Sequence, residues 1–594
     1  MVGSLLTFEG TTSRGVVGYD RTVMLAGGVG FTATSWAQKR SLQAGDVLVL
    51  LGGDNYRIGM AGGSVSSVGS GEVAAALELS AVQRANPEMQ KRVYNVIRAL
   101  CERQQNPIKS IHDHGAGGHL NCFSELIDPV GGRIDAAALP VGDSTLSFRE
   151  LLSNESQERM GLAVAPDALR DLQELAERER APMYIVGEIT GDERILVTAP
   201  EGQPPVDLPL SVLFGSAPQT TLVDETVPLE ASAVALGVDS PEALRKLIDD
   251  VLRLESVACK DWLTNKVDRC VTGRVALQQC AGPYQLPINN LGIAALDYCS
   301  NKGIASSIGH APVAALIDER AGAVLSVAEA LTNIIWAPLE HGIESVALSA
   351  NWMWPAKQPG EDVRLYNAVA ALSEFCVSLG IAVPTGKDSL SMTMRYDDGS
   401  AVRAPGTVIV SGCAVVADIR RVVTPDLKPE LDSVLLHIDL SGDERFPLGG
   451  SAAAQVRSQL GSRTPTVADA ERFKRGLQAV QSCITQGLVL AGHDISSGGL
   501  GTALIEMAVT GDFGLRVQLD GERAVDALFC EKPGVVLQVR TADIPAVVAA
   551  FESLPLEPQR VARLAAEKVV ELNVGSISLT RSVADLRRVW FETS

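Results

Sequence analysis

The amino-acid sequence predicts an α/β protein made of tandem domains, in which two similar domains flank a third of a different kind. A histidine, an aspartate and a glycine-rich run occur together twice, at Ile111–Gly118 and Gly492–Gly499. A second pair of similar segments follows, beginning at Leu152 and at Leu528. Landmarks that recur in the same order indicate a duplicated domain.

A third landmark lies upstream of each copy, where an apolar segment ends in glycines at Leu51–Gly53 and Leu448–Gly450. The alternative is chance recurrence of glycine-rich turns. A single match would fit that alternative, but an ordered series favours duplication.

The region between the copies alternates helical and strand patterns, which favours a separate α/β domain. A polar linker is expected around residues 219–240, followed by a helix at Ala243–Leu254 that Ser240 begins. A second helix is expected at Ala321–Ile335, and prolines indicate a boundary near residue 420. Strands are expected at Val271–Leu277, Val313–Ile317, Ile343–Leu348, Ile381–Pro384 and Thr407–Val415.

The composition narrows the class of protein. With 46% hydrophobic and 21% charged residues, the chain is globular rather than disordered. A net charge of −20 argues against nucleic acid or an anionic membrane as the main partner. The ten cysteines form no C-x-x-C pair, and the first residues lack the pattern of a signal peptide. We therefore expect a cytoplasmic protein with reduced thiols and no membrane span.

Glu329 and Asn333 lie one helical turn apart in the segment expected to be a helix, so their side chains share one face. A carboxylate and an amide oxygen placed in this way can bind a hard cation such as Mg²⁺. A solvated helix face is the alternative, and the pair alone favours it.

Two His-Asp pairs, His112-Asp113 and His493-Asp494, end short apolar segments and precede glycine-rich turns that open helices. The free amides of a helix N-terminus bind anions, so this layout suits a metal–phosphate cluster. Alternatively, each aspartate caps its helix.

Two lysines are further candidates. Lys260 precedes a strand-like segment at 265–275 and could reach a phosphate. Gly386-Lys387-Asp388-Ser389 gathers an ammonium, a carboxylate and a hydroxyl on one turn. An ordinary surface lysine and an ordinary polar turn are the alternatives.

These residues belong to longer strings that resemble signatures of the formylglycinamide ribonucleotide amidotransferases, or phosphoribosylformylglycinamidine synthases. No single string is specific, but together they run along nearly the whole chain and are most similar to the large, single-chain type. The strings are Met24–Gly28, Tyr56–Gly59, Asn154–Arg159, Thr264–Gly273, Gln278–Pro287, Glu329–Asn333, Asn351–Met353 and Gly386–Ser389.

The resemblance implies a fold in which two units similar to aminoimidazole ribonucleotide synthetase form a pseudo-dimer. Each unit has an N-terminal half and a C-terminal half. For this chain it implies a remnant of a preceding domain with an entry strand at 1–35, a first C-terminal-type domain at 36–225, a second N-terminal-type domain at 226–420 and a second C-terminal-type domain at 421–594.

The resemblance also implies a reaction of purine biosynthesis. ATP phosphorylates the amide oxygen of formylglycinamide ribonucleotide, and ammonia then displaces phosphate to give the amidine. Glutamine supplies the ammonia through a glutaminase domain, and the second unit holds a structural nucleotide with Mg²⁺. The expected cofactors are therefore ATP or ADP and Mg²⁺.

Carried over position by position, the resemblance implies three sets of site residues. His112 and Asp113 belong to the loop beside the catalytic nucleotide. The nucleotide-binding residues are Lys260, Ser496, Gly115, Gly117, Gly118 and Lys387. The metal ligands are Glu329, Asn333, Asp494 and Asn290.

The sequence departs from the family pattern in three respects. The glycine-rich ATP loop of the first unit is missing, and so is the glutaminase domain. Asn290 stands where the family has a metal-binding aspartate, beside a segment two residues shorter, and Ser497 replaces another aspartate. We therefore expect no synthase activity from the chain alone, and we expect Asn290→Asp to strengthen binding of ADP with Mg²⁺.

Three hypotheses follow. The chain acts with a separate glutaminase and the missing synthase half, or it is an inactive truncated paralogue that serves as a nucleotide-binding scaffold. The third is another ATPase of the superfamily, such as one that handles selenophosphate or thiamine phosphate, and the signature strings argue against it.

Overall fold

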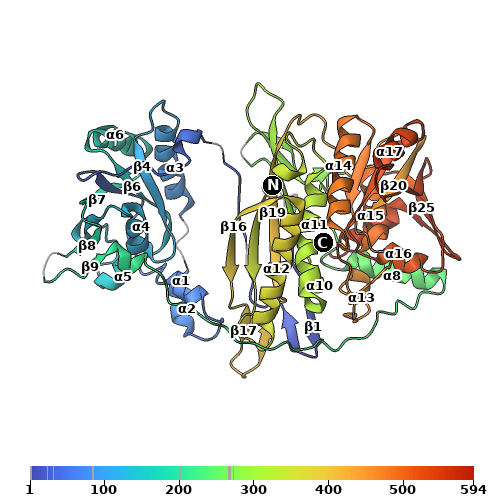
Figure 1. Ribbon diagram of the computed structural model, residues 1–594, viewed down its shortest axis with the longest axis horizontal. Coiled ribbons are helices and arrows are strands. Elements are labelled where there is room, and N and C mark those ends of the chain that lie inside the picture. Colours follow the sequence, from blue (N-terminus) through green and yellow to red (C-terminus); the bar gives the residue numbers. More distant parts are fainter. Residues whose placement is uncertain are drawn as a thin grey trace. The chain divides into compact units, whose positions relative to one another are not determined.

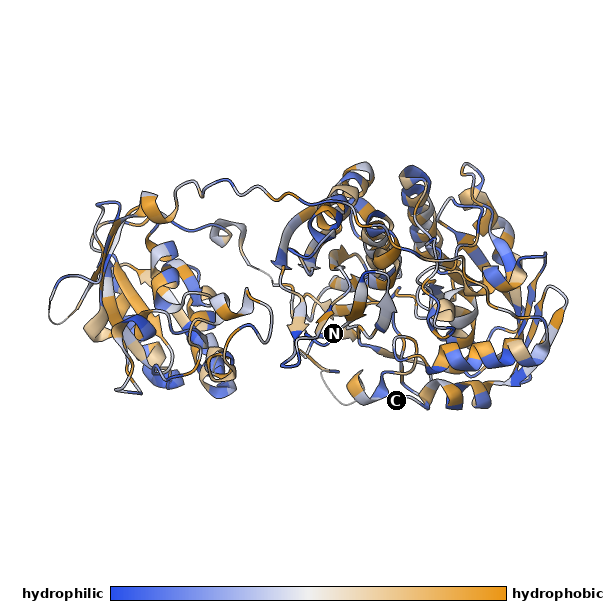
Figure 2. Cartoon of the chain, turned by 90° about the horizontal axis from the view of Figure 1, so that it is seen from below, coloured by the Kyte–Doolittle hydropathy of each residue, from blue (hydrophilic) through white to orange (hydrophobic). Residues whose placement is uncertain are grey.

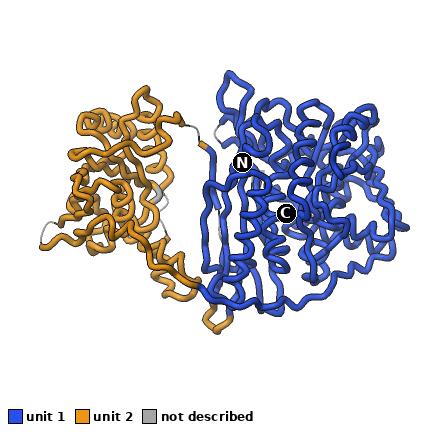
Figure 3. The backbone as a smooth tube through the Cα atoms, viewed as in Figure 1, with its two compact units in different colours: residues 1–29, 222–394, 401–594 blue, residues 30–221, 395–400 orange. Residues whose placement is uncertain are grey.

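The computed structural model describes residues 3–22, 25–30, 32–82, 86–199, 202–264, 269–271 and 273–594. It forms two compact units: unit 1 comprises residues 1–29, 222–394 and 401–594, and unit 2 comprises 30–221 and 395–400 (Figure 3). Met24 and residues 265–268 and 272 of the signature strings lie outside the described residues. Within the described ranges, no helix combines the length and the apolar character that crossing a membrane requires.

Unit 2 is built on a seven-stranded mixed sheet with helices on both faces (Figure 1). Leu48 and Leu50 of its central strand β3 share a core with α4 (Gly118–Ile127). Val49 and Leu51 share the opposite core with α3 (Pro87–Cys101) and α6 (Leu169–Glu179). Because side chains alternate along a strand, one apolar run serves both cores. In spatial order the strands are β4 (Ile108–His114), β6 (Ser156–Val164), β3 (Val47–Leu51), β7 (Met183–Ile189), β5 (Gly132–Asp135), β8 (Arg194–Thr198) and β9 (Val206–Pro209).

The C-terminal part of unit 1 contains a sheet with the same strand order. Its strands are β21 (Ala491–Asp494), β23 (Gly534–Arg540), β20 (Ser433–Asp439), β24 (Gln559–Ala565), β22 (Gly514–Leu519), β25 (Val569–Val574) and β26 (Ile577–Ser582). In both copies the His-Asp strand leads through glycines into a helix, α4 in unit 2 and α15 (Gly499–Gly511) in unit 1. The duplication predicted from the sequence is therefore confirmed.

One landmark of the repeat is wrong. Gly52 follows β3, whereas Gly450 precedes α13 (Ala452–Gln455), and the counterpart of β3 is β20. Both glycines have positive φ and lie against backbone: a Cβ on Gly52 would approach the carbonyl oxygen of Glu158 to 2.8 Å, and one on Gly450 would approach the nitrogen of Ala314 to 2.9 Å. Similar local demands on glycine thus arise at different places in the fold.

The preceding part of unit 1 is a six-stranded sheet packed with two long helices, α11 (Glu319–Ile334) and α12 (Glu361–Leu379) (Figure 1). The side chain of Asp318 accepts the N–H of Ala321 at 3.0 Å and caps α11. As expected, this helix carries Glu329 and Asn333. The strands are, in spatial order, β10 (Val275–Leu277), β13 (Gly292–Ala295), β14 (Gly303–Gly309), β19 (Thr407–Val416), β15 (Ala347–Met353) and β16 (Ala382–Ser389).

Three expectations for this part are wrong. Residues 343–345, expected as the start of a strand, form a 3-10 helix, and β15 begins only at Ala347. Residues 313–317, expected as a strand, form helix α10 (Pro312–Ile317), because Pro312 suits a first helical turn and a short apolar run does not distinguish helix from strand. Gly386–Ser389 is not a turn but the end of edge strand β16, paired in parallel with β15. Lys387 and Asp388 therefore point to opposite faces of that sheet.

The segment before α8 (Pro241–Arg253) has no regular secondary structure between residues 214 and 239, as the linker prediction required. Ser240 then caps the helix by accepting the N–H of Ala243 at 3.3 Å. Hydrophobic residues concentrate in the strands of both units (Figure 2).

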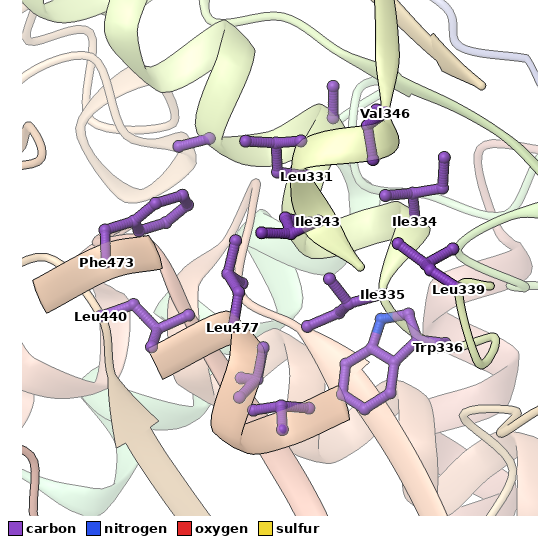
Figure 4. Packing of buried hydrophobic residues seen from close by; sticks show 14 of the residues in the cluster. Leu331, Ile334, Ile335, Trp336, Leu339, Ile343, Val346, Leu440, Phe473 and Leu477 are labelled. Atoms are coloured by element: carbon purple, nitrogen blue, oxygen red, sulfur yellow. The ribbon is translucent and has the colours of Figure 1, made fainter. Parts of the chain in front are cut away.

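One apolar core joins the two parts of unit 1 (Figure 4). Leu331, Ile335 and Trp336, from α11 and the turn after it, share this core with Phe473 and Leu477 of α14 (Ala470–Thr485). Since all five side chains are fully buried, they fix the end of α11 against the C-terminal part of unit 1.

Candidate functional site

A pocket of about 820 Å³, including the part open to solvent, lies within unit 1 and is lined by both of its parts. His310 and Glu329 line it from the first part, and Ser496 and Glu531 from the second. Residues 5–7 add an apolar wall, and the hydroxyl of Ser4 hydrogen-bonds with Nε2 of His310.

Two carboxylates, Glu329 and Glu531, line this pocket, and the charge of a third, Asp494, acts on Glu329. Glu329 accepts the backbone N–H of His310 at 2.6 Å. Asp494 is 3% exposed; its Oδ1 lies 3.0 Å from Nδ1 of His493, and its buried Oδ2 has no hydrogen-bond partner among the described residues. Glu531 also lines the pocket, with its Oε1 bound to two backbone N–H groups.

Burial raises the carboxyl pKa values of Glu329 and Glu531. Burial raises the pKa of Glu329 to about 8; the charges of Asp494 and Glu531 add to this, against the opposing hydrogen bond from His310. Burial also raises the pKa of Glu531 to about 7, against its two backbone hydrogen bonds. A bound cation would favour the ionised forms of Glu329 and Glu531. Among the described residues, no group of three or more His, Cys, Asp and Glu side chains is placed to hold a metal ion, so a cation at this site would need other ligands as well.

Two amides border the carboxylates. Nδ2 of Asn333 donates to the carbonyl of Ile308 at 3.1 Å. In the orientation that satisfies both ends of its amide, Asn290 donates to Oδ1 of Asp494 at 3.2 Å and accepts from Nε1 of Trp336 at 2.7 Å. Asn290 therefore meets the cluster as a hydrogen-bond partner of Asp494.

The glycine-rich loop after β21 contributes Ser496 and Ser497 to the pocket and leads into α15. Gly498 and Gly499 have φ values of 90° and 71°, and a Cβ on Gly499 would approach the backbone of Phe529 to 2.7 Å. No side chain caps α15, so the alternative that Asp494 is its cap is wrong. An uncapped helix N-terminus beside a pocket attracts an anion.

Lys260 lies near the same pocket. Burial lowers the pKa of His310 to about 4, and the positive charge of Lys260 acts in the same direction. Burial lowers the pKa of Lys260 itself, while the negative charge of Glu506 on α15 opposes that shift. The positive charge of Lys260 and the negative charge of Glu506 therefore lie close enough to influence each other.

In unit 2, as in unit 1, a glutamate accepts a backbone N–H of the glycine-rich loop and one of a second segment. Oε1 of Glu155 accepts the N–H of Gly63 at 2.9 Å and that of Gly117 at 3.2 Å. Asp113 accepts the N–H of Gly115 at 2.7 Å, and no side chain caps α4, so the capping alternative is wrong here too.

The structure places the sequence-predicted site residues in three locations. Glu329 and Ser496 line the pocket of unit 1. Asp494, Asn290, Asn333 and Lys260 lie outside its lining, and their contacts and charges connect them to its residues. Those at the loop of unit 2 are His112, Asp113, Gly115, Gly117 and Gly118. Lys387 is exposed on β16 and is not among the residues that line the pocket.

Sequence reasoning missed two residues of the site. Glu531 had a usable signal, because it recurs as Glu155 in the second landmark of the repeat. His310 contributes its backbone N–H to Glu329, and a main-chain donor leaves no trace in a side-chain pattern.

Two family models match the chain. The FGAR-AT PurM_N-like domain covers residues 259–415, and the AIR synthase related protein, C-terminal domain, covers 43–199 and 434–575. A probable phosphoribosylformylglycinamidine synthase of Arabidopsis thaliana is 39% identical over 97% of this chain, and the phosphoribosylformylglycinamidine synthase of Homo sapiens is 39% identical over 97%. The chain belongs to the phosphoribosylformylglycinamidine synthase family. The resemblance found in the signature strings is confirmed, as is the fold class of two C-terminal-type domains flanking an N-terminal-type domain.

This member of the phosphoribosylformylglycinamidine synthase family spans 42% of the Arabidopsis relative and 44% of the human one. Among solved structures, Thermotoga maritima PurL complexed with FGAR matches with a TM-score of 0.62 at 18% identity, over 93% of this chain and 74% of that one. The same protein complexed with ATP matches with a TM-score of 0.57 at 18% identity, over 93% and 73%. At this identity the likeness shows the shared fold.

Proposed function

We propose that this chain is the synthase part of a phosphoribosylformylglycinamidine synthase, a purine-biosynthesis ligase that converts formylglycinamide ribonucleotide to the amidine with ATP. The pocket of unit 1 carries the proposal. There, the carboxylates of Glu329 and Glu531, with the charge of Asp494 acting on Glu329, meet a glycine-rich loop at a helix N-terminus. Carboxylates bind Mg²⁺ and helix N-termini bind phosphates, so the pocket suits a magnesium nucleotide.

The solved relatives support this ligand class. Complexes of Thermotoga maritima PurL with FGAR, with ATP and with ADP have been solved. We extend these ligands to the present chain.

The residues present fit Mg²⁺, because Oδ2 of Asp494 lacks a partner and the carboxyl pKa values of Glu329 and Glu531 are raised. Glu329 and Asp494 would hold the ion, with the amide oxygen of Asn333 as a neutral ligand and Asn290 steadying Asp494. When bound, the ion neutralises phosphate charge. Lys260 and Ser496 would contact the phosphates.

We assign the chemical steps to the glycine-rich loop of unit 2. Gly115, Gly117 and Gly118, which carry no side chains, would let the phosphates of the reacting ATP approach the backbone beside His112 and Asp113. The amide oxygen of the substrate attacks the γ-phosphorus and ADP leaves. Ammonia then adds to the activated carbon, loses a proton, and phosphate departs with the oxygen. Positioning and charge neutralisation are the protein's part in such a reaction.

Partners would supply what this chain does not span of its relatives. Ammonia would come from a separate glutaminase, and a second chain would supply the remaining synthase half. A structure of PurLQS from Thermotoga maritima, with a TM-score of 0.59 at 18% identity, supports a multi-subunit arrangement. We propose that Lys387, exposed on the edge strand β16, reaches a phosphate of a nucleotide bound where this second chain joins.

Calorimetric titration of ADP, with and without Mg²⁺, tests the proposal. We expect Mg²⁺-dependent binding that Asp494→Asn weakens, and no ADP release dependent on formylglycinamide ribonucleotide from the chain alone. Release should begin when the missing synthase half and ammonium are added. Binding without turnover in every combination would favour the inactive scaffold, and absence of binding would refute the nucleotide site.

A further inference from the structure

Glu506 on α15 is a largely buried carboxylate that contacts His493. Its Oε2 lies 3.4 Å from Nε2 of His493, and the two side chains are 14% and 8% exposed. The other ring nitrogen of His493 lies 3.0 Å from Oδ1 of Asp494. The imidazole therefore spans two carboxylates, one on the helix and one at the end of β21.

The same carboxylate is close to Lys260. Burial lowers the pKa of Lys260, and the negative charge of Glu506 is the largest of the influences that raise it. Nζ of Lys260 also donates to the carbonyl of Ala258 at 2.5 Å. Glu506 thus acts on Lys260 through its charge and on Asp494 through His493.

Unit 2 contains the corresponding pair. Nε2 of His112 forms an ion pair with Glu125 on α4, at the same interval along the chain as His493 and Glu506. The neighbouring core positions differ between the copies: His114 and His119 in unit 2 correspond to Ile495 and Leu500 in unit 1. The histidine–glutamate pair is thus the same in both units although the adjacent core residues differ. We therefore assign the pair to the His-Asp loop and not to packing of the core.

From these contacts we infer that Glu506 is a positioning residue for nucleotide binding in unit 1. It orients His493, which fixes Oδ1 of Asp494 and leaves Oδ2 for a cation. This inference rests on the proposed function. It adds Glu506, which is not one of the residues proposed to contact Mg²⁺ or the phosphates.

The test compares Glu506→Gln, which keeps the shape and removes the charge, with Glu522→Gln, the same change at an exposed glutamate of unit 1 outside the pocket lining. Affinities for ADP with Mg²⁺ and for adenosine are measured by calorimetry, and folding is monitored by thermal unfolding. We expect Glu506→Gln to weaken ADP binding about tenfold, as loss of an outer-shell partner does at metal sites, and to leave adenosine binding unchanged. Glu522→Gln should change neither, and Glu506→Asp should recover part of the ADP affinity.

The outcomes separate the inference from the proposed function. Unchanged ADP affinity in Glu506→Gln, or equal losses for ADP and adenosine, would overturn the positioning role while the nucleotide site stands. Absence of ADP binding by the unmodified chain would overturn the proposed function and this inference with it.

Discussion

The carboxylate of Glu531 accepts the backbone N–H of Gly498 at 2.7 Å, and Glu155 makes the same contact with Gly117 at 3.2 Å. In each copy one buried glutamate therefore ties the glycine-rich loop to a second segment of its domain, at Ala452 in unit 1 and Gly63 in unit 2.

Glu531→Ala removes the acceptor of two backbone N–H groups in unit 1. We expect a loss of about 1–3 kcal/mol in the free energy of unfolding, because unsatisfied buried donors carry a desolvation cost. Glu531→Gln, whose carbonyl can still accept, should lose less. Urea denaturation measures both, with the exposed Glu522→Ala as control. Equal stability of Glu531→Ala and the unmodified chain would show that the loop does not need this brace.

Gly492→Ala should disturb the carboxylate cluster through Trp336. A Cβ at residue 492 would lie 2.0 Å from the indole ring, so the ring or β21 must shift. Overpacking of this kind costs about 1–3 kcal/mol. Near-ultraviolet circular dichroism and urea denaturation report the shift and the cost. Gly27→Ala, where no atom lies within 4 Å, is the control and should change neither.

Unit 2 should lose stability in mild acid because of His114 and His119. Burial lowers the pKa of both well below the ordinary value, and the charge of Arg159 lowers them further. The unfolded chain then binds protons that the folded chain does not, so stability is full above about pH 6.5 and is lost as pH falls toward the folded pKa values.

His114→Ile, which installs the residue that unit 1 carries as Ile495, should flatten this dependence. Urea denaturation between pH 7.5 and 5.5 measures the slope for each variant. His341→Ile, at an exposed histidine of unit 1, should leave the slope unchanged. An equally steep slope in His114→Ile would assign the acid sensitivity to other groups.

The sequence predicted what local geometry determines. Glu329 and Asn333 share a face because the helix spacing places them there, and the two His-Asp strands lead into glycine-opened helices as expected. The approach of Asp494 to Glu329 depends on the packing of Trp336 and Phe473 across unit 1, which no local pattern specifies. The turn preference of its neighbours predicted a turn at Lys387. That prediction is wrong because the pairing of β16 with β15 overrides this preference.

Asn290→Asp tests the charge of the proposed cation site. An aspartate can still accept from Nε1 of Trp336, but it replaces the donor that faces Oδ1 of Asp494 with a second negative oxygen. Without a cation the two carboxylates repel, so we expect the free energy of unfolding in EDTA to fall by about 1–3 kcal/mol. With Mg²⁺ the added charge becomes a ligand charge, and ligand charge is a main control of affinity at such sites.

ADP with Mg²⁺ should therefore bind more tightly to Asn290→Asp than to the unmodified chain, and saturating ligand should restore its stability. Asn573→Asp, on β25, adds the same charge outside the pocket lining and should leave ADP binding unchanged. Equal affinities of the unmodified chain and Asn290→Asp would refute the charge argument, and a failure of both to bind would show that this pocket holds no magnesium nucleotide.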